Sequence, residues 1–427
     1  MQIHVVRPGE TLYSIARQYG VSVTLLGRLN QVPAGGALAV GQTLVVYEPE
    51  RVHVVRPGET LEGIARREGV SVLSLYQNNY FLGRRSRILP DEELIVALKG
   101  EKSGTLGVNG YAYTFIRQEQ LRTMLPYITY LTPFTYGVTS QGGLVVPDDG
   151  PLLAAAPQYG AQLWMHLSTL TDSGSFDSRL GGALLENETA QKALIDAVAA
   201  NMAEKGYQGL DVDFEYLEGR QAAAYTAFID ALRQRLNPLG WPVIVALAPK
   251  SSAEQRGLLY EAHDYAALSH AANAVLLMTY EWGYTAGPPM AVAPLPQVRR
   301  VLDYALTEMA PEKIFLGVPT YGYDWPLPFR QGITRAPSLS PQEALALARR
   351  YGAEIQYDET AQSPWFRYTA ETGTVHEVWF EDARSSLAKL RLAADNGLQG
   401  VGLWNLMRDA PQTYLVLNGA FQVEKLA

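Results

Sequence analysis

A repeated segment near the N-terminus limits the possible folds more than any other feature of this sequence. Ile3–Leu12 reads IHVVRPGETL, and Val52–Leu61 reads VHVVRPGETL at an offset of 49 residues. A second pair of matching segments follows the two copies, Ile15–Val23 and Ile64–Val72. A repeat at a fixed spacing indicates copies of one structural unit. The sequence therefore predicts two similar units in tandem.

Each unit has the pattern of a short β-α-α-β structure. In the first unit a strand ends at a Pro-Gly turn, and Thr11 is placed to cap a helix whose apolar residues recur at helical spacing. A glycine ends that helix, and a second helix and a last strand follow. We therefore expect two modules, over residues 1–49 and 50–98. The polar, glycine-containing residues 99–106 then form a linker.

The strand, the Pro-Gly-Glu-Thr-Leu segment and the following Ile-Ala resemble the LysM module, and the likeness covers residues 1–98. LysM modules bind glycans that contain N-acetylglucosamine, such as peptidoglycan and chitin. Matched position by position, the resemblance implies glycan-binding residues at Gly9, Glu10, Thr11 and Leu12, and at Gly58, Glu59, Thr60 and Leu61. The alternative is that these residues only form a turn, a helix cap and part of the core.

From about residue 106 the chain alternates between strand-like and helix-like segments. Eight strands are predicted, at Gly107–Phe115, Ile128–Gly137, Gln162–Ser168, Gly209–Glu215, Val243–Ala248, Ala274–Glu281, Ile314–Tyr321 and Gly400–Asn405. This order predicts an α/β fold, a (β/α)8 TIM barrel, over residues 107–427. A doubly wound open sheet is the competing fold, but no glycine-rich phosphate fingerprint follows an early strand. The long gap at residues 322–399 predicts a small α+β insertion between the seventh and eighth strands.

Three carboxylates alternate along the predicted strand Gly209–Glu215. Residues two apart on a strand share a face, so Asp211, Asp213 and Glu215 should point together into the barrel. Ionising three neighbouring carboxylates is unfavourable because their negative charges repel one another. At least one pKa should therefore rise, and one acid should stay protonated near neutral pH. A proton donor beside carboxylates is what cleavage of a glycosidic bond needs. A metal site and a buried acidic network are the alternatives.

This part of the chain, over roughly residues 106–427, resembles glycoside hydrolase family 18. The Asp-x-Asp-x-Glu core of the family is present, although Gln208 replaces an acid that often precedes it. The segment Met-Thr-Tyr-Glu at 278–281 is similar to the family's Met-x-Tyr-Asp, and Gly400–Asn405 is similar to its eighth strand. The resemblance implies substrate contacts from Met278, Tyr280, Glu281 and Trp404. Tyr111, an aromatic residue on the first predicted barrel strand, is a further candidate for a substrate contact.

The resemblance also implies a retaining mechanism without a protein nucleophile, in which the 2-acetamido oxygen of the substrate attacks the anomeric carbon. Glu215 would be the proton donor, Asp213 would orient the acetamido group, and Asp211 would tune Asp213. Tyr280 would bind the acetamido carbonyl, and Trp404 would form the floor of the subsite. Further aromatic and imidazole side chains near the predicted strand ends are candidates for sugar contacts or for barrel core, namely Tyr113, Trp164, His166, Trp282, Tyr284, Tyr321, Tyr323 and Trp325.

Composition excludes several other classes of protein. The chain has no cysteine, so a disulfide framework, a thiolate nucleophile and a cysteine-ligated metal are impossible. The net charge of −8 argues against a nucleic-acid partner. No apolar run approaches the roughly 18 residues that span a bilayer, and the N-terminus MQIHVVRPGE lacks the apolar core of a standard signal peptide. We expect a monomer that needs no metal or cofactor.

Two LysM-like units before a family 18-like barrel, without a signal peptide, resemble the spore-associated hydrolases of endospore-forming bacteria. This resemblance implies a hydrolase that cleaves β-1,4 bonds at N-acetylglucosamine in spore cortex peptidoglycan. It also implies a location in the spore coat or cortex, or at the cell wall. A chitinase acting on poly-N-acetylglucosamine and a non-catalytic glycan-binding protein are the alternatives, and the presence of Glu215 argues against the second.

Overall fold

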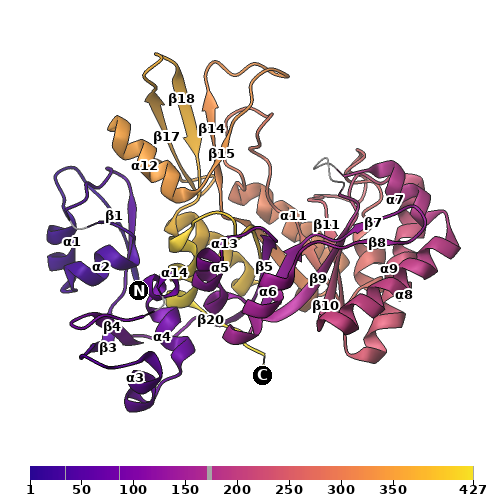
Figure 1. Ribbon diagram of the computed structural model, residues 1–427. Coiled ribbons are helices and arrows are strands. Elements are labelled where there is room, and N and C mark those ends of the chain that lie inside the picture. Colours follow the sequence, from indigo (N-terminus) through magenta and orange to yellow (C-terminus); the bar gives the residue numbers. More distant parts are fainter. Residues whose placement is uncertain (34, 86, 171–175, 427) are drawn as a thin grey trace.

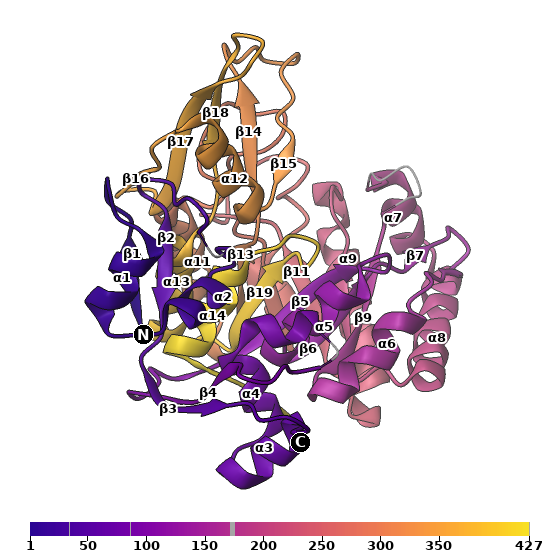
Figure 2. The same ribbon diagram turned by 60° about the vertical axis from the view of Figure 1, so that its left-hand side comes forward.

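The computed structural model describes residues 1–33, 35–85, 87–170 and 176–426. Two small N-terminal modules lie against one side of a larger barrel, and a small sheet stands above that barrel (Figure 1). Turning the molecule by 60° shows the first module beside the small sheet and the second module below it, near the C-terminus (Figure 2).

Module 1 has the predicted β-α-α-β order. Its elements are β1 (Gln2–Val5), α1 (Leu12–Tyr19), α2 (Val23–Leu29) and β2 (Thr43–Val46), and β1 pairs with β2 in antiparallel fashion. Helix α1 begins because the Thr11 side chain accepts a hydrogen bond from the backbone of Ser14, and it ends at Gly20 with a φ of 66°. Ile15 and Ala16 on its inner face are fully buried.

Module 2 repeats this order and adds one turn of 3-10 helix. Its elements are β3 (Pro49–Val54), α3 (Leu61–Glu68), α4 (Val72–Asn78), η1 (Tyr80–Arg84) and β4 (Glu93–Leu98). The added turn carries Tyr80 and Phe81, which are buried. Tyr80 stacks on Tyr414 of the barrel with ring centroids 5.7 Å apart, so this turn is one of the parts of module 2 that contact the barrel.

The described part of the larger domain forms a closed barrel of eight parallel strands. In sequence order they are β5 (Thr105–Tyr113), β6 (Tyr130–Phe134), β9 (Gln162–Ser168), β10 (Gly209–Asp213), β11 (Val243–Leu247), β12 (Ala274–Leu277), β13 (Ile314–Pro319) and β19 (Gly400–Trp404). Strand β19 pairs with β5 and closes the barrel, which confirms the predicted fold. The first strand begins at Thr105, so two residues predicted as linker belong to the barrel.

Helices surround the barrel and bury one face against it. They are α5 (Gln118–Met124), α6 (Gly150–Ala155), α7 (Ser178–Leu185), α8 (Glu188–Lys205), α9 (Ala222–Leu236), α10 (Tyr265–Ala271), α11 (Leu295–Glu308), α13 (Ala383–Asp395) and α14 (Pro411–Ala420). In α8, Asn187 caps the first turn and Gly206 ends the helix in the left-handed conformation. Leu194, Val198 and Met202 recur every four residues and are fully buried, which is the pattern of a helix packed on a sheet.

The predicted insertion between the seventh and eighth strands is a small α+β unit. Residues 322–399, all described, contain β14 (Gly322–Pro326), β15 (Ser338–Leu339), α12 (Pro341–Tyr351), β16 (Gln356–Asp358), β17 (Ser363–Thr369) and β18 (Val375–Trp379), followed by α13. The strands pair as an antiparallel sheet in the order β15-β14-β18-β17-β16, with Phe366 and Val378 in its buried core. Strand β14 follows β13 almost directly, so the insertion stands at the C-terminal ends of the barrel strands (Figure 1).

Direct contacts hold the modules on the barrel along an interface that we call the seam. Thr43 of β2 donates from Oγ1 to Gln412 Oε1 at 2.7 Å, and Gln412 Nε2 donates back to the Thr43 carbonyl at 2.6 Å. Tyr47 donates to the Leu415 carbonyl at 2.7 Å. In module 2, Gln77 donates to the Pro126 carbonyl at 2.8 Å. The seam therefore positions the modules by hydrogen bonds far outside the predicted linker.

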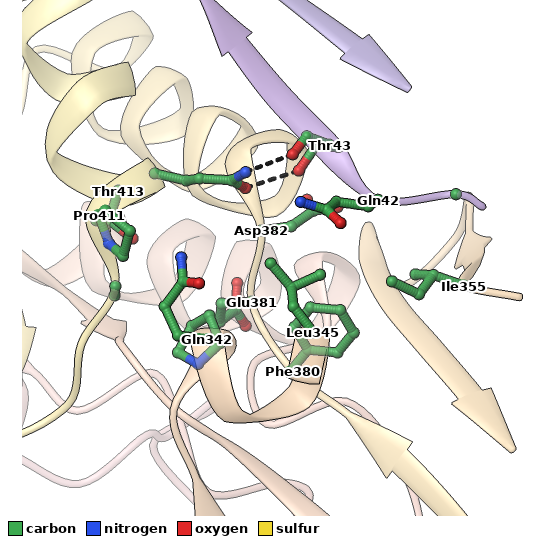
Figure 3. A pocket seen from close by; sticks show the side chains of 14 residues that line it. Gln42, Thr43, Gln342, Leu345, Ile355, Phe380, Glu381, Asp382, Pro411 and Thr413 are labelled. Atoms are coloured by element: carbon green, nitrogen blue, oxygen red, sulfur yellow. Dashed lines mark hydrogen bonds between the residues drawn. The ribbon is translucent and has the colours of Figure 1, made fainter. Parts of the chain in front are cut away.

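Module 1 also touches the insertion. The Ile355 N–H donates to the Val40 carbonyl at 2.9 Å, and the neighbouring Gly41 has a φ of 82°. A Cβ atom at Gly41 would lie 1.9 Å from the Ile355 carbonyl oxygen, so only glycine allows this approach. Figure 3 shows Gln42 and Thr43 of module 1 beside a small cavity at this junction. The cavity has a volume of about 10 Å³, roughly the space of a single water molecule.

Candidate active site

Asp211 and Asp213 lie buried on β10, and Glu215 follows two residues after the strand ends. The prediction placed all three on one strand, but β10 ends at Asp213. Glu215 therefore lies in the segment that leaves the barrel, at the end where barrel enzymes carry out their chemistry. Tyr216, the next residue, has a φ of 59°. A non-glycine residue in this left-handed region is strained, and such strain gathers at functional sites.

The pKa values of all three carboxyl groups are raised above their usual range. Burial raises the pKa of Asp211 to about 7, although the hydrogen bond from Tyr111 acts in the opposite direction. Burial, and then the charges of Glu215 and Asp211, raise the pKa of Asp213 well above its usual value. Burial and the nearby charge of Glu281 raise the pKa of Glu215 to about 7. A carboxylic acid that stays protonated near neutrality is suited to act as a general acid.

A chain of hydrogen bonds supports Asp211 from two neighbouring strands. Thr132 donates to Asn109 Oδ1 at 2.7 Å, Asn109 Nδ2 donates to the Tyr111 hydroxyl at 2.9 Å, and Tyr111 donates to Asp211 Oδ2 at 2.5 Å. The sequence pointed to Tyr111 but missed Asn109 and Thr132. The available signal was Asn109, a polar residue two positions before Tyr111 on the same face of a predicted core strand.

Trp404, at the end of β19, lies among the aromatic rings of the site. Its ring is nearly parallel to that of Tyr280, at 14°, with centroids 6.4 Å apart. It also lies 5.8 Å from the Tyr111 ring and 4.9 Å from the Phe134 ring. Met278 packs on the same interior cluster. The structure thus brings Tyr111, Met278, Tyr280 and Trp404 together at one end of the barrel.

Glu281 joins this site in an unusual backbone conformation. It was predicted to end a strand, but β12 ends at Leu277, and Glu281 has a φ of 67°. Its carboxylate accepts hydrogen bonds from the hydroxyls of Tyr321 and Tyr323, the latter at 3.0 Å. Burial raises the pKa of Glu281, and both tyrosine hydrogen bonds oppose that rise. Tyr321 and Tyr323, two of the further aromatic candidates, therefore orient a carboxylate of the site.

Other aromatic candidates belong to the core. Trp164 stacks on Tyr130 inside the barrel, with ring centroids 3.8 Å apart. Trp325 is fully buried and donates to the Gly287 carbonyl at 2.8 Å, which fixes a loop above the barrel. Tyr284 remains exposed at the surface.

Each module carries a groove between the start of its first helix and the loop before its last strand. The groove of module 1 has a volume of about 670 Å³ and is lined by Glu10, Thr11, Leu12 and Tyr13 together with residues from α2 and the loop after it. The groove of module 2 has about 250 Å³ and is lined by Glu59, Thr60, Leu61, Glu62, Tyr76, Leu82, Arg85, Arg87 and Ile88. Six of the eight predicted glycan-binding residues thus border a groove, and Gly9 and Gly58 do not.

The same residues also stabilise the fold within each module. Thr60 caps α3, as Thr11 caps α1. Glu10 accepts a hydrogen bond from the Arg7 N–H at 2.8 Å and lies 2.8 Å from His4 Nε2, and Glu59 repeats both contacts with Arg56 and His53. Gly9 and Gly58 share a φ of 82° at the turn. The turn-and-cap role predicted as one alternative is present, and six of these residues also line a groove; that they bind glycan stays a prediction.

Comparison with known families agrees with this geometry. Residues 171–409 match the model of glycosyl hydrolases family 18, and residues 4–46 and 53–97 match that of the LysM domain. The chain belongs to glycosyl hydrolase family 18. This family 18 protein is therefore a glycoside hydrolase with two LysM domains ahead of its barrel.

Relatives of this family 18 hydrolase match it along its whole length. It is 40% identical to the cortical fragment-lytic enzyme of Bacillus subtilis, over 100% of this chain and 99% of that protein. The crystal structure of the Bacillus megaterium spore cortex-lytic enzyme SleL is similar with a TM-score of 0.84 and 36% identity, over 100% of this chain and 99% of that one. A chitinase from Chromobacterium violaceum covers 74% of this chain and 98% of its own, with a TM-score of 0.68 and 26% identity.

The described residues also lack two features, a metal-binding group and a membrane-spanning helix. In that part of the hydrolase, no group of three or more histidine, aspartate and glutamate side chains is arranged to hold a metal ion. Among the same residues, no helix combines the length and apolar character that crossing a bilayer requires.

Proposed function

We propose that this family 18 hydrolase cleaves the glycan strands of spore cortex peptidoglycan at the β-1,4 bonds of N-acetylglucosamine. The observation that carries the proposal is the carboxylate cluster at the mouth of the barrel, in which Asp211 and Asp213 are buried and Glu215 is partly buried, with pKa values raised toward neutral pH. Full-length similarity to enzymes named cortical fragment-lytic and cortex-lytic supports cortex as the substrate. The two LysM grooves support attachment to the same polymer and a location at the spore cortex or cell wall.

In the first step Glu215 gives its proton to the glycosidic oxygen. The bond from that oxygen to the anomeric carbon breaks, and its electron pair stays with the leaving oxygen. At the same time the carbonyl oxygen of the 2-acetamido group bonds to the anomeric carbon from the opposite face. Asp213 orients the acetamido N–H and balances the positive charge of the resulting oxazolinium ring. The hydroxyl of Tyr280 binds the acetamido carbonyl, and Trp404 supports the sugar ring from below.

In the second step Glu215, now a carboxylate, takes a proton from a water molecule as the water attacks the anomeric carbon. The bond to the acetamido oxygen breaks, the acetamide is restored, and Glu215 is protonated again. Two inversions at one carbon give net retention of configuration. The route needs an N-acetyl group beside the bond that breaks, which matches the glycans that LysM modules bind.

A chitinase reading remains the second candidate because the described barrel also resembles a solved chitinase. Chitin and cortex peptidoglycan both carry the 2-acetamido group that the proposed steps require. That chitinase matches 74% of this chain, whereas the cortex-lytic relatives match the modules as well as the barrel. The extent of the match therefore favours cortex.

The test compares turnover of the full-length protein on purified cortex fragments and on chitin oligomers, with products identified by mass spectrometry. We expect faster release of products from cortex fragments, with N-acetylglucosamine at the new reducing ends. Glu215→Gln should lower turnover on both substrates by at least about 10³-fold while leaving binding intact, because its amide cannot donate the proton. Glu218→Gln is the matched control, because Glu218 lies in the same loop but is exposed.

Faster turnover of chitin than of cortex would replace the cortex proposal with the chitinase reading. Full activity of the Glu215→Gln variant would remove Glu215 as the proton donor.

A further inference from the structure

His166 is a buried imidazole beside the carboxylate cluster that the proposed steps leave without a role. It lies on β9 and is 1% exposed. In the pairing of β9 with β10 it lies directly opposite Asp211, and Ser168 lies opposite Asp213. Its Nε2 atom is 3.8 Å from Asp213 Oδ2. One ring nitrogen of His166 is therefore aimed at the carboxyl group that is proposed to orient the substrate.

Hydroxyl groups fix which nitrogen of His166 carries the proton. Thr135 Oγ1 lies 2.6 Å from His166 Nδ1 and 2.9 Å from Ser168 Oγ. Ser168 Oγ in turn accepts the Leu170 N–H at 3.2 Å, which leaves its own proton free to go to Thr135. The carbonyls of Tyr136, at 3.2 Å, and of His166, at 3.4 Å, are the other acceptors near the Thr135 hydroxyl. The contact with Nδ1 is the shortest of the three, and we assign the Thr135 proton to it, which makes Nδ1 the acceptor. In a neutral imidazole the proton must then sit on Nε2, the atom that faces Asp213.

The ring also stays neutral. Burial lowers the pKa of His166 to about 3. The ring packs against Phe134 and Tyr111, and the Asp213 carboxyl, 3.8 Å from Nε2, lies beyond hydrogen-bond distance. His166 therefore offers a hydrogen-bond donor that does not change its charge across the working pH range.

Asp213 needs such a donor. Within the described residues, Asp213 Oδ1 has no hydrogen-bond partner. Burial, and then the charges of Glu215 and Asp211, raise the pKa of Asp213. Burial, and with it the charge of Asp213, in turn raises the pKa values of four nearby hydroxyls, those of Tyr111, Tyr280, Tyr225 and Tyr216. The Tyr111 hydroxyl already donates to Asp211, and the Tyr280 hydroxyl is assigned to the substrate.

We propose that His166 is a positioning residue, whose neutral Nε2–H donates to the Asp213 carboxylate and fixes it while Asp213 holds the acetamido group of the substrate. A small rotation of the Asp213 side chain closes the gap of 3.8 Å to hydrogen-bond distance. The inference rests on the proposed function, because it assigns His166 to the orientation of Asp213 in that reaction. Thr135 contributes by holding the proton of His166 on Nε2.

The test combines three variants of the full-length enzyme with kinetics on a soluble N-acetylglucosamine oligomer. His166→Phe keeps a ring but loses both nitrogens, and we expect kcat to fall about 10- to 100-fold, as loss of a hydrogen bond to a charged group implies. KM should change less than about threefold, since the lost contact acts on the reacting state. His166→Gln, which restores an N–H donor at a similar reach, should recover at least half of the loss on a logarithmic scale.

Thr135→Val removes the hydroxyl that fixes the proton on Nε2, so kcat should fall by an intermediate factor. Thr123→Val is the matched control, because Thr123 is a buried threonine whose hydroxyl donates only to a carbonyl of its own helix, at 2.8 Å. The pH profile adds a readout that a structural role would not move. A donor to the Asp213 carboxylate lowers its pKa, so His166→Phe should shift the acid limb of kcat/KM to higher pH.

Nitrogen-15 NMR of the wild-type histidines tests the tautomer without any variant. The chain has six histidines, and His166 should appear as the neutral form with its proton on Nε2 from pH 5 to pH 8. A proton on Nδ1 instead would overturn the proposal, as would an unchanged kcat and acid limb in His166→Phe. Inactive wild-type enzyme, or an active Glu215→Gln variant, would overturn the proposed function itself, so the two failures are distinguishable.

Discussion

The mouth of the barrel and the seam both bury polar side chains, but their hydrogen bonds differ. At the mouth, Asp211 Oδ1 and Asp213 Oδ1 have no partner within the described residues. At the seam, Gln412 and Thr43 exchange two hydrogen bonds, and Gln412 Oε1 also accepts the Ala383 N–H at 3.0 Å. Two seam atoms among the described residues lack a partner: Glu381 Oε1, which borders the cavity of Figure 3, and the hydroxyl of Tyr414, whose ring stacks on Tyr80.

This difference in hydrogen bonding fits a catalytic role for the mouth of the barrel and a structural role for the seam. A buried polar atom without a partner destabilises the fold by about 1–3 kcal/mol, so it persists where a ligand can satisfy it. At the mouth of the barrel, the unpaired carboxyl oxygens remain available to a ligand, and burial raises the carboxyl pKa values toward neutrality. At the seam, Gln412 and Thr43 form their hydrogen bonds with each other and with the protein backbone. Variants at the two places should therefore change different quantities.

The largest effect is expected at the mouth. Asp213→Asn keeps the shape of the side chain but cannot carry the negative charge that balances the oxazolinium ring, so kcat should fall by about 10²- to 10³-fold. Asp303→Asn, an exposed change on α11, should leave kcat unchanged. Initial rates on a soluble N-acetylglucosamine oligomer measure both variants. More than a tenth of wild-type activity in Asp213→Asn would contradict the role given to its charge.

A smaller effect, on stability alone, is expected at the seam. Gln412→Ala leaves the Thr43 carbonyl and the Ala383 N–H without partners, so the unfolding free energy should drop by about 2–3 kcal/mol. Turnover of the soluble oligomer should not change. Urea denaturation followed by circular dichroism measures the loss, with the exposed Gln158→Ala as the matched control. A loss of kcat equal to that of Asp213→Asn would show that the seam takes part in catalysis.

The raised pKa of Glu215 should lower the stability of the folded protein as pH rises. The pKa of Glu215 is raised from 4.5 to about 7, so the folded state retains a proton that the unfolded state releases between these pH values. Stability therefore falls as pH rises through this window. Glu215→Gln carries no charge at any pH, so its Tm should exceed that of the wild type at pH 8 by a few degrees, and the gap should shrink at pH 5. Calorimetry at both pH values measures this, and an equal gain in the exposed Glu218→Gln would refute the explanation.

The smallest effect is expected in the module grooves. Tyr13 lines the groove of module 1 and is 65% exposed, so its ring is available to stack on a sugar. Tyr13→Ala should weaken binding to insoluble peptidoglycan by about 1 kcal/mol, roughly fivefold, and leave turnover of a soluble oligomer unchanged. Glu62→Ala, at the same position of the repeat in module 2, is the matched comparison. Sedimentation with insoluble wall measures both, and a parallel loss of turnover would place the groove in the catalytic cleft.

Local patterns predicted most of the fold. Alternating segments gave the eight barrel strands, with Gln162–Ser168 correct at both ends, and the 49-residue repeat gave both modules. The predicted ends of β10 and β12 were too late. The segments that follow these strands contain Tyr216 and Glu281 in left-handed backbone conformations, which residue type alone does not indicate.

Contacts between distant segments could not be predicted. Thr43 and Gln412 are 369 positions apart, and nothing in either segment specifies the other. The pairing of His166 with Thr135 depends on how β6 and its following segment lie beside β9. The carboxylates were predictable because one short segment, 211–215, carries their spacing, whereas their supporting residues come from several strands.

The seam sets how this enzyme can search a polymer. A domain on a flexible tether samples many distances from its anchor, and its effective concentration follows from the length of that tether. Here both modules are fixed on the barrel by the seam. A glycan chain bound in either groove therefore approaches the mouth of the barrel at one distance and one angle. The distance between each groove and the carboxylate cluster is then constant. Under the proposed function, only glycosidic bonds at that distance from the bound sugars can reach the carboxylates.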